Sequence, residues 1–208
     1  HEISLSKYST IEPLYFDGIR TKFNFDNYAI SLGGFYWLSS RWNISLGGML
    51  MKEQYKQLDE VDQDFRFQDF QFKKNKSFNL SKFQVRSNLS FSGVNQHYEF
   101  LEGINFDLFT ETIQTKNYPE ASFLRVITKL SYYKRVLKKG NFAFSHTLGI
   151  ATNNDSPFTP FVLDGFLNVR GIGNRVSRGT AEHIINAEYR HSILNKKHFI
   201  LQVVALTD

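Results

Sequence analysis

The chain has 208 residues and a net charge of +5 at pH 7, and 16% of its residues are aromatic. It contains no cysteine, which excludes a disulfide framework, a thiol nucleophile and a cysteine-based metal site. The length and a hydrophobic share of 41% are sufficient for one folded domain, and the mild charge excess does not indicate nucleic-acid binding. The aromatic residues include 21 Phe and 10 Tyr against two Met, a composition typical of strands.

The sequence contains no run of about 18 apolar residues, so it predicts no transmembrane helix. Its first residues, His1 to Ser4, have neither an initiator Met nor the basic and apolar regions of a signal peptide. The mean hydropathy of −0.35 is compatible with a membrane β-barrel, because the strands of such a barrel turn every second side chain toward a wet lumen.

Apolar and polar residues alternate along most of the chain, which predicts strands rather than helices. In chain order the predicted strands are 14–25, 27–38, 42–52, 80–91, 97–111, 123–136, 142–152, 181–193 and 198–208. The clearest alternation places Lys82, Gln84, Arg86, Asn88 and Ser90 opposite Phe83, Val85, Leu89 and Phe91. Strands of about ten residues are long enough to cross a bilayer when tilted, whereas globular strands average about half that length.

The connections between the predicted strands alternate between short and long. Short turns are predicted at 39–41, 92–96, 138–141 and 195–197, with Gly140 in a left-handed conformation. Longer polar stretches cover 53–79, 112–122 and 153–179. Outer-membrane barrels have this asymmetry, with short periplasmic turns and long external loops. In 53–79, alternating Phe residues with a slip at Asp69 predict an external loop with its own hairpin, while a soluble β-sandwich is the alternative for the whole pattern.

Three segments near the C-terminal end carry a recognisable pattern. Val169-Arg170-Gly171-Ile172 lies in the connection 153–179, Glu188-Tyr189-Arg190 lies in the next strand, and Leu206-Thr207-Asp208 lies in the last strand. This arrangement resembles the C-terminal barrel region of the BamA/TamA family of outer-membrane proteins, the bacterial surface antigen superfamily. The resemblance is most specific over 123–208. Asp164-Gly165 stands where the family has two glycines, and Ile172 stands where it has an aromatic residue.

The resemblance implies an all-β fold, a transmembrane antiparallel β-barrel. Residues 1–208 are then one barrel domain with about ten strands of a sixteen-stranded barrel, and we expect the chain to be a partial stretch of a larger protein. The segment 53–79 becomes an external loop, and 153–179 becomes the sixth loop, folded back into the lumen. Arg170 is then expected to meet Glu188 and Asp208 there, since a guanidinium leaving bulk water needs paired carboxylates.

The implied function is that of a protein insertase or translocon that assembles or exports proteins at the bacterial outer membrane. It involves no enzymatic chemistry and no cofactor. The implied partners are outer-membrane lipids and lipopolysaccharide, client outer-membrane or secreted proteins, POTRA domains in the same chain and accessory lipoproteins, without nucleic acid. Two alternatives stay open: the membrane-anchor barrel of an enzyme fusion carrying a patatin-like lipase or a phosphoesterase, and a passive pore.

The remaining polar residues indicate no further chemistry. The six histidines have no metal-binding spacing, and His183 and His191 are too far apart along one strand to share an ion. The acidic run from Asp59 to Asp64 is interpreted as a solvated loop rather than a Ca²⁺ site. The cations on the predicted lumen face, Lys82 and Arg125 among them, are expected to pair with acids such as Glu99 and Asp107. No metal site and no catalytic residue are predicted.

Overall fold

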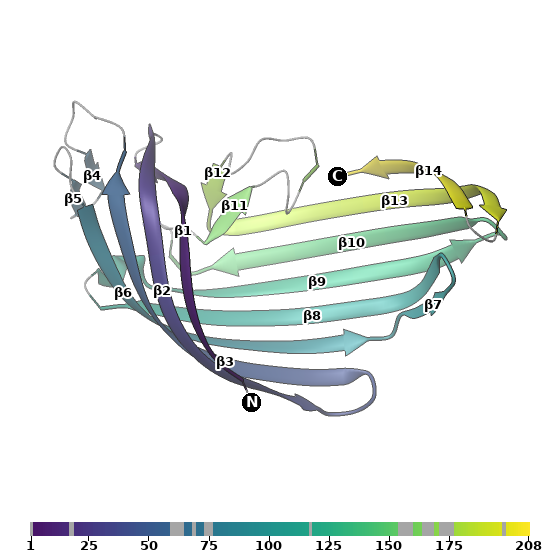
Figure 1. Ribbon diagram of the computed structural model, residues 1–208, viewed down its shortest axis with the longest axis horizontal. Helices are drawn as coiled ribbons and strands as arrows, with labels where there is room; N and C mark the ends of the chain where they lie inside the picture. Colours follow the sequence, from purple (N-terminus) through teal and green to yellow (C-terminus); the bar gives the residue numbers. More distant parts are fainter. Residues whose placement is uncertain are drawn as a thin grey trace.

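A ten-stranded antiparallel sheet dominates the computed structural model, which describes residues 2–16, 19–58, 65–67, 70–72, 77–116, 118–153, 160–163, 169–170, 177–196 and 199–208 (Figure 1). Its strand order is β1-β2-β3-β6-β8-β9-β10-β13-β14, with β7 beside β8. The strands are β1 (Glu2–Phe16), β2 (Ile19–Trp37), β3 (Trp42–Gln57), β6 (Ser77–Ser92), β7 (Asn95–His97), β8 (Phe100–Thr115), β9 (Phe123–Val136), β10 (Gly140–Ala151), β13 (Ala181–Lys196) and β14 (Phe199–Thr207).

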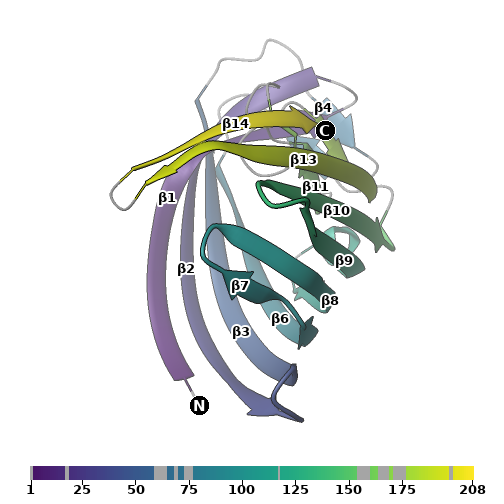
Figure 2. The same cartoon turned by 90° about the vertical axis from the view of Figure 1, so that its right-hand side faces the viewer.

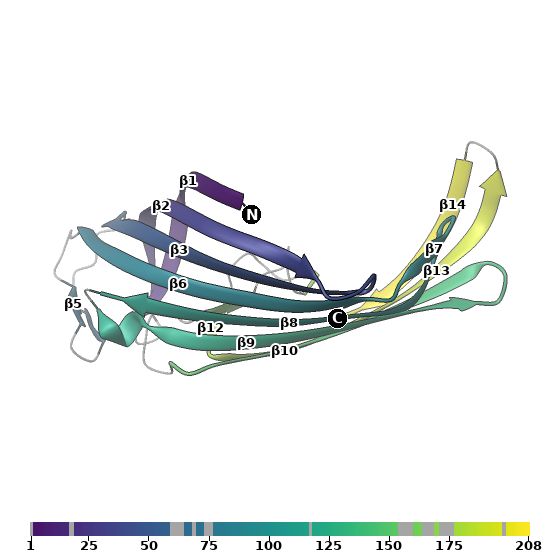
Figure 3. The same cartoon turned by 90° about the horizontal axis from the view of Figure 1, so that it is seen from below.

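The sheet is curled into an open trough. Its strands follow one another around the trough in Figure 2, and their curvature along their length is visible in Figure 3. Among the described residues, β1 pairs only with β2 and β14 pairs only with β13, so each forms an edge. Sheets of long strands twist in one direction and curl as strands are added, which accounts for the trough. No helix in the described part of the chain is long and apolar enough to cross a membrane.

Two small hairpins and one helical turn lie in the longer connections. β4 (Phe65–Phe67) pairs with β5 (Phe70–Phe72), which confirms the hairpin predicted in 53–79. β11 (Phe161–Leu163) pairs with β12 (Ser177–Gly179) in the connection before β13. A 3-10 helix, η1 (Pro119–Ala121), joins β8 to β9. The acidic run from Asp59 to Asp64 lies outside the described residues.

The first two predicted strands had wrong boundaries. The sequence predicted 14–25 and 27–38, but β1 ends at Phe16 and β2 continues through Asp26 to Trp37. Asp26 interrupts the apolar pattern without interrupting the strand, because it sits opposite Gln54 in the sheet and accepts a 2.5 Å hydrogen bond from the Ser9 hydroxyl. A polar residue on an exposed strand face therefore does not mark a turn.

Two turns also differ from the prediction. The connection predicted at 92–96 contains β7, and the chain reverses at Tyr98, which has a positive φ of 56°. In the β9–β10 turn the left-handed residue is Leu137, with φ 57°, and not Gly140. Gly140 is required for a different reason: a Cβ there would lie 2.5 Å from the hydroxyl of Tyr189 and 2.8 Å from the carbonyl oxygen of Val136.

The two faces of the sheet differ in chemistry, as the alternation predicted. The face that we call the inner face carries buried polar residues, including Glu53, Lys82, Gln84 and Glu111. The opposite, outer face carries exposed apolar side chains on every long strand, including Ile3, Leu5, Ile30, Leu32, Leu46, Leu50, Phe83, Val85, Ile104, Leu124, Leu130, Leu148, Ile150 and Ile185.

The apolar core is small and lies at one end of the sheet. Buried residues of β1, β2, β3 and β6 form it on the inner face, together with one residue of η1: Leu14, Phe23, Phe25, Tyr55, Phe78, Leu80 and Ala121. The rings of Tyr55 and Phe78 are stacked with centroids 4.6 Å apart. This cluster lies toward the end of the trough that carries the long connections, while buried polar residues such as Lys82, Gln84 and Glu111 occupy the inner face further along the strands.

Candidate functional site

The candidate site lies where the connection between β10 and β13 meets the inner face of the sheet. Three separate contacts hold the described parts of this connection against the wall of the trough. They involve β1 on one side, β9 and β10 in the middle, and β13 with the residue after β14 on the other side. The connection is therefore attached across the trough and not only at its two ends.

Arg170 makes the contact with β13 and with the end of β14. Its Nε and Nη2 donate to the two carboxylate oxygens of Asp208, at 2.9 and 2.7 Å, and its backbone N–H donates to Asp208 at 2.8 Å. Its Nη1 donates to Glu188 Oε2 at 3.1 Å. One guanidinium thus bridges two neighbouring strands, and its planar fork matches the carboxylate of Asp208 in a bidentate pair.

The two acids are placed by the alternation of their strands. Glu188 lies on the inner face of β13, opposite Ala143 of β10 and Leu206 of β14. Asp208 follows β14 two residues beyond Leu206, so it points to the same face. Its side chain is only 4% exposed, against 44% for Arg170. Within the cluster the two acids are therefore the covered members and Arg170 is the more exposed one.

Further polar groups complete this cluster. The Asn186 amide donates to Asp208 Oδ1 at 2.8 Å, and Arg190 forms a hydrogen-bonded ion pair with Glu188. The hydrogen bonds to Asp208, followed by those to Glu188, raise the pKa of the Arg170 guanidinium above its already high ordinary value. Arg170 is consequently charged at every pH at which the fold exists, and the cluster of two arginines and two acids is balanced in charge.

A second contact fixes the start of the connection on β9 and β10. The Phe161 ring of β11 is 5% exposed and rests on Gly149, where a Cβ would lie 2.5 Å from a ring carbon of Phe161. Nearby, Arg125 Nη1 donates to the carbonyl oxygen of Pro160 at 3.3 Å. Gly149 therefore provides the space that this part of the connection occupies.

The third contact is an ion pair between Arg178 of β12 and Glu12 of β1. Both side chains are mostly buried, at 12% and 13% exposure. Because β1 and β13 are far apart in the strand order, this pair joins the two sides of the trough through the connection. A mostly buried pair requires both partners, since removal of one leaves an uncompensated charge.

The sequence pattern found the acids of this site but not all of the contacts. The structure brings Arg170 together with both Glu188 and Asp208, and their functional role stays a prediction. Val169 lies beside Arg170 in the chain, and Gly171 and Ile172 lie outside the described residues. The contacts of Phe161, Gly149, Arg178 and Glu12 were missed, because they join residues 12 to 166 positions apart and carry no local motif.

The inner-face cations Lys82 and Arg125 pair with inner-face acids, as expected, but the two acids given as examples were wrong. Lys82 pairs with Glu53 at 2.6 Å, and Arg125 pairs with Glu111 at 2.5 Å, in place of Glu99 and Asp107. Glu99 instead accepts a hydrogen bond from Asn195, and Asp107 accepts one from Ser90. The alternation gives the face of each residue, whereas the partner depends on the register between strands.

Two of the histidines contact each other, which the sequence did not predict. His146 of β10 and His183 of β13 lie on the outer face with their Nε2 atoms 2.8 Å apart. Among the described residues, no group of three or more His, Cys, Asp or Glu is placed to hold a metal ion. The pair is therefore a hydrogen bond between two imidazoles and supplies no metal site by itself.

Comparison with solved structures identifies the arrangement of the strands. The crystal structure of BamA from Haemophilus ducreyi lacking POTRA domains 1-3 matches 94% of this chain with a TM-score of 0.63 and 13% sequence identity. The match covers 43% of the BamA chain, so this chain spans less than half of that protein. No family sequence profile matches the chain, and no curated protein matches it. The likeness therefore shows a BamA-like barrel fold and nothing about activity.

Proposed function

We propose that the chain forms part of the barrel of an outer-membrane insertase or translocon of the BamA/TamA family. In this proposal it belongs to a closed, sixteen-stranded barrel that assembles or exports proteins at the bacterial outer membrane, without enzymatic chemistry. The observation that carries the proposal is the simultaneous contact of Arg170 with Glu188 and Asp208. The sequence resemblance implies this contact, which the structure contains. The BamA-like arrangement of the strands is a second, independent support for the proposal.

The proposed mechanism uses the barrel as a scaffold on which client strands form. Strands of a client protein add to an exposed strand edge by β-augmentation, and main-chain hydrogen bonds supply the affinity. The growing client keeps its backbone groups paired, as the bilayer interior demands. Arg170 would hold β13 and the end of β14 at a fixed distance, so that the wall stays rigid while the edge is engaged. The proposed partners are client proteins, POTRA domains in the same chain, accessory lipoproteins and the surrounding lipids.

The first test reverses the charge of Arg170. We expect Arg170→Glu to lower thermal stability and to reduce client assembly by about tenfold or more, because it places three carboxylates together. Assembly is measured as protease-resistant client barrel formed in proteoliposomes that contain the purified protein. Arg41→Glu is the matched control, because Arg41 is exposed in the β2–β3 turn and its hydrogen bonds, with Ser39 and Ser92, use its backbone N–H and carbonyl oxygen and not its side chain.

A double-mutant cycle then tests the pairing itself. Asp208→Arg or Glu188→Arg in the Arg170→Glu background should recover part of the lost stability and assembly. Strictly additive effects would contradict the pairing. Wild-type protein that conducts ions but assembles no client would instead favour a passive pore. Hydrolysis by a further domain of the protein, again without client assembly, would favour the anchor of an enzyme fusion.

A further inference from the structure

Three lysines on the outer face lie in a single row that crosses β1, β2, β3 and β6 and ends at Lys116, directly after β8. Lys7 of β1 sits opposite Tyr28 of β2, and Tyr28 sits opposite Lys52 of β3. Lys52 sits opposite Ser81 of β6, and the backbone N–H of Lys116 donates to the Ser81 carbonyl oxygen at 2.9 Å. Neighbouring lysines of this row are two strands apart, or about 10 Å at a strand spacing of about 4.8 Å. We call these five residues the basic row.

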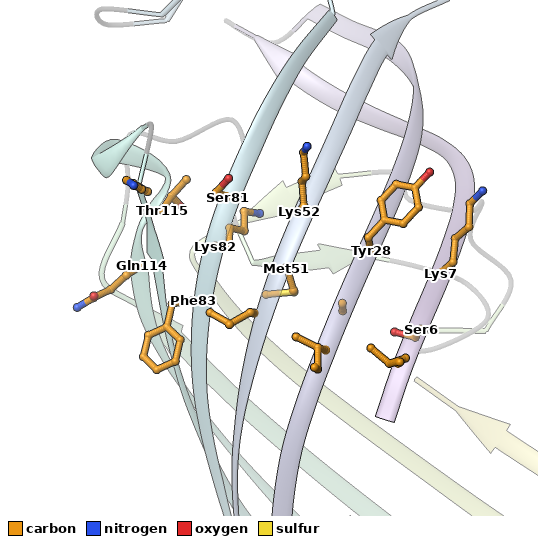
Figure 4. A pocket seen from close by; sticks show the side chains of 15 residues that line it. Ser6, Lys7, Tyr28, Met51, Lys52, Ser81, Lys82, Phe83, Gln114 and Thr115 are labelled. Atoms are coloured by element: carbon orange, nitrogen blue, oxygen red, sulfur yellow. The ribbon is translucent and has the colours of Figure 1, made fainter. Parts of the chain in front are cut away.

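The next row along the strands is apolar. Leu5, Ile30, Leu50 and Phe83 sit opposite one another in turn, and all four are exposed, Leu5 by 81%. The basic row and this apolar row line a groove of about 1,050 Å³ on the outer face (Figure 4). The basic row forms its polar border, and the apolar row forms its floor. A ligand that fills this groove must have a polar head and an apolar body.

The apolar surface continues beyond the first groove. A second groove of about 780 Å³ is lined by residues of the following rows, among them Leu32, Gly34, Leu46 and Gly48. It ends at Tyr36, eight residues along β2 from Tyr28. Eight residues span about 27 Å of strand, which a tilt of about 40° reduces to about 20 Å across the membrane. The two grooves together thus cross more than one leaflet, which is about half of a hydrocarbon core of about 30 Å, so an acyl chain that starts at the basic row covers the first groove and the near end of the second.

The charge of the basic row is not neutralised within the sheet. In the part of the chain that the structure describes, Lys7, Lys52 and Lys116 have no ion pair, although Lys7 lies 5.3 Å from the Tyr28 ring centroid. The nearest acid on this face along β2, Asp26, accepts a hydrogen bond from Ser9. Long flexible lysines at the edge of an apolar belt extend their ammonium groups toward the headgroup layer. The row therefore attracts anionic headgroups.

We propose that the first groove binds a phosphate-bearing glycolipid of the outer leaflet, of the lipopolysaccharide class. The lysines contact its phosphates, and its acyl chains lie along the first groove and reach the near end of the second. The basic row is at the end of the strands that leads into the long connections after β3 and β8, the end expected to face the cell exterior. This placement rests on the proposed function, because only an outer-membrane barrel meets that lipid.

The test measures lipid retention directly. The full chain is purified in detergent, mixed with lipopolysaccharide, and analysed by native mass spectrometry for the fraction of protein that carries lipid. We expect Lys7→Glu, Lys52→Glu and Lys116→Glu together to reduce that fraction by at least about tenfold, because each basic residue contributes separately to anionic-lipid binding. The matched control reverses three exposed lysines at the opposite end, Lys134, Lys138 and Lys139, and should leave retention unchanged.

A second measurement changes the lipid and leaves the protein intact, so that a folding defect has no influence. Wild-type protein should retain the same lipid poorly after its phosphates are removed, and the triple Lys→Arg variant should bind like wild type. Equal retention of both lipids, or full retention by the triple Glu variant, would overturn the proposal. Client assembly without lipid retention refutes this site alone, whereas lipid retention without client assembly refutes the proposed function alone.

Discussion

Leu137 has a backbone conformation that is unfavourable for leucine. Its φ is 57° in the turn between β9 and β10, and its side chain is 83% exposed, so packing compensates little. A left-handed conformation costs an L-residue about 1–2 kcal/mol, and asparagine tolerates it better. We predict that Leu137→Asn increases the free energy of unfolding by about 0.5–1 kcal/mol. Urea denaturation of the purified protein in lipid or detergent measures this change.

The control for this prediction is another exposed leucine in a turn. Leu38 is 57% exposed between β2 and β3, and its φ is not positive. We expect Leu38→Asn to change stability by less than about 0.5 kcal/mol. A similar gain in both variants would show that removing an exposed apolar side chain, and not relief of backbone strain, stabilises the protein.

For single residues, the sequence predicted which face of the sheet a side chain lies on better than it predicted which side chain it contacts. The alternation put Glu188 and Asp208 on the polar face, and both point there. It did not predict that Lys82 binds Glu53, because the two residues are 29 positions apart in strands whose register is set by the whole sheet. The left-handed residue was wrong for a similar reason. Glycine suits a positive φ, but Gly140 is needed where Tyr189 packs.

At the scale of elements, the contact of Phe161 with Gly149 determines how β11 rests on β10. A Cβ at position 149 would lie 2.5 Å from the Phe161 ring, a distance that forces one of them to move. We predict that Gly149→Ala destabilises the protein by about 1–3 kcal/mol, the usual cost of overpacking, and detaches β11. Because the chain has no cysteine, a single Val162→Cys substitution reports detachment through faster labelling by a water-soluble maleimide.

Two further variants separate crowding from a general effect of replacing glycine. Phe161→Leu combined with Gly149→Ala should slow labelling at position 162 again in part, since the smaller side chain removes the two closest contacts of the new methyl group and leaves the one with Glu182 Cγ at 2.9 Å. Gly48→Ala should have little effect, because its Cβ would meet nothing closer than 3.8 Å. Fast labelling in the Gly48→Ala variant, or no rescue by Phe161→Leu, would contradict the proposed contact.

Element boundaries were predictable wherever both faces of a strand kept their pattern. The prediction for 123–136 agrees with β9 at both ends, and that for 181–193 gives most of β13. The first two strands were divided wrongly, because the boundary predicted at Asp26 lies inside β2. In this sheet the outer face changes from apolar to polar toward the strand ends. A strand therefore continues past its last apolar residue. Its end is set by pairing with the neighbouring strands, which the pattern of one strand does not contain.

At the scale of the whole molecule, the two faces define how the sheet would lie in a membrane. The apolar belt of the outer face is bordered by the basic row on one side and by Tyr36 and Trp42 on the other. Leu46 lies about midway between these borders and is 64% exposed, while its neighbour Ser45 points to the inner face near Asp107. Residues 45 and 46 therefore lie at the same depth along the sheet, but Ser45 faces the polar inner side and Leu46 faces the apolar outer side.

We predict that Leu46→Arg disfavours folding into lipid bilayers by about 2–4 kcal/mol, because a charge at the bilayer midplane must lose water. Ser45→Arg should cost less than about 1 kcal/mol, since the inner face is polar and a guanidinium there keeps contact with the water of the lumen. Urea titrations of folding in vesicles of defined thickness measure both values. The difference between them should disappear in a detergent whose micelle adapts to the protein. If both variants behave alike in bilayers, water contacts both faces, and the soluble β-sandwich that the alternation also allows would replace the membrane barrel.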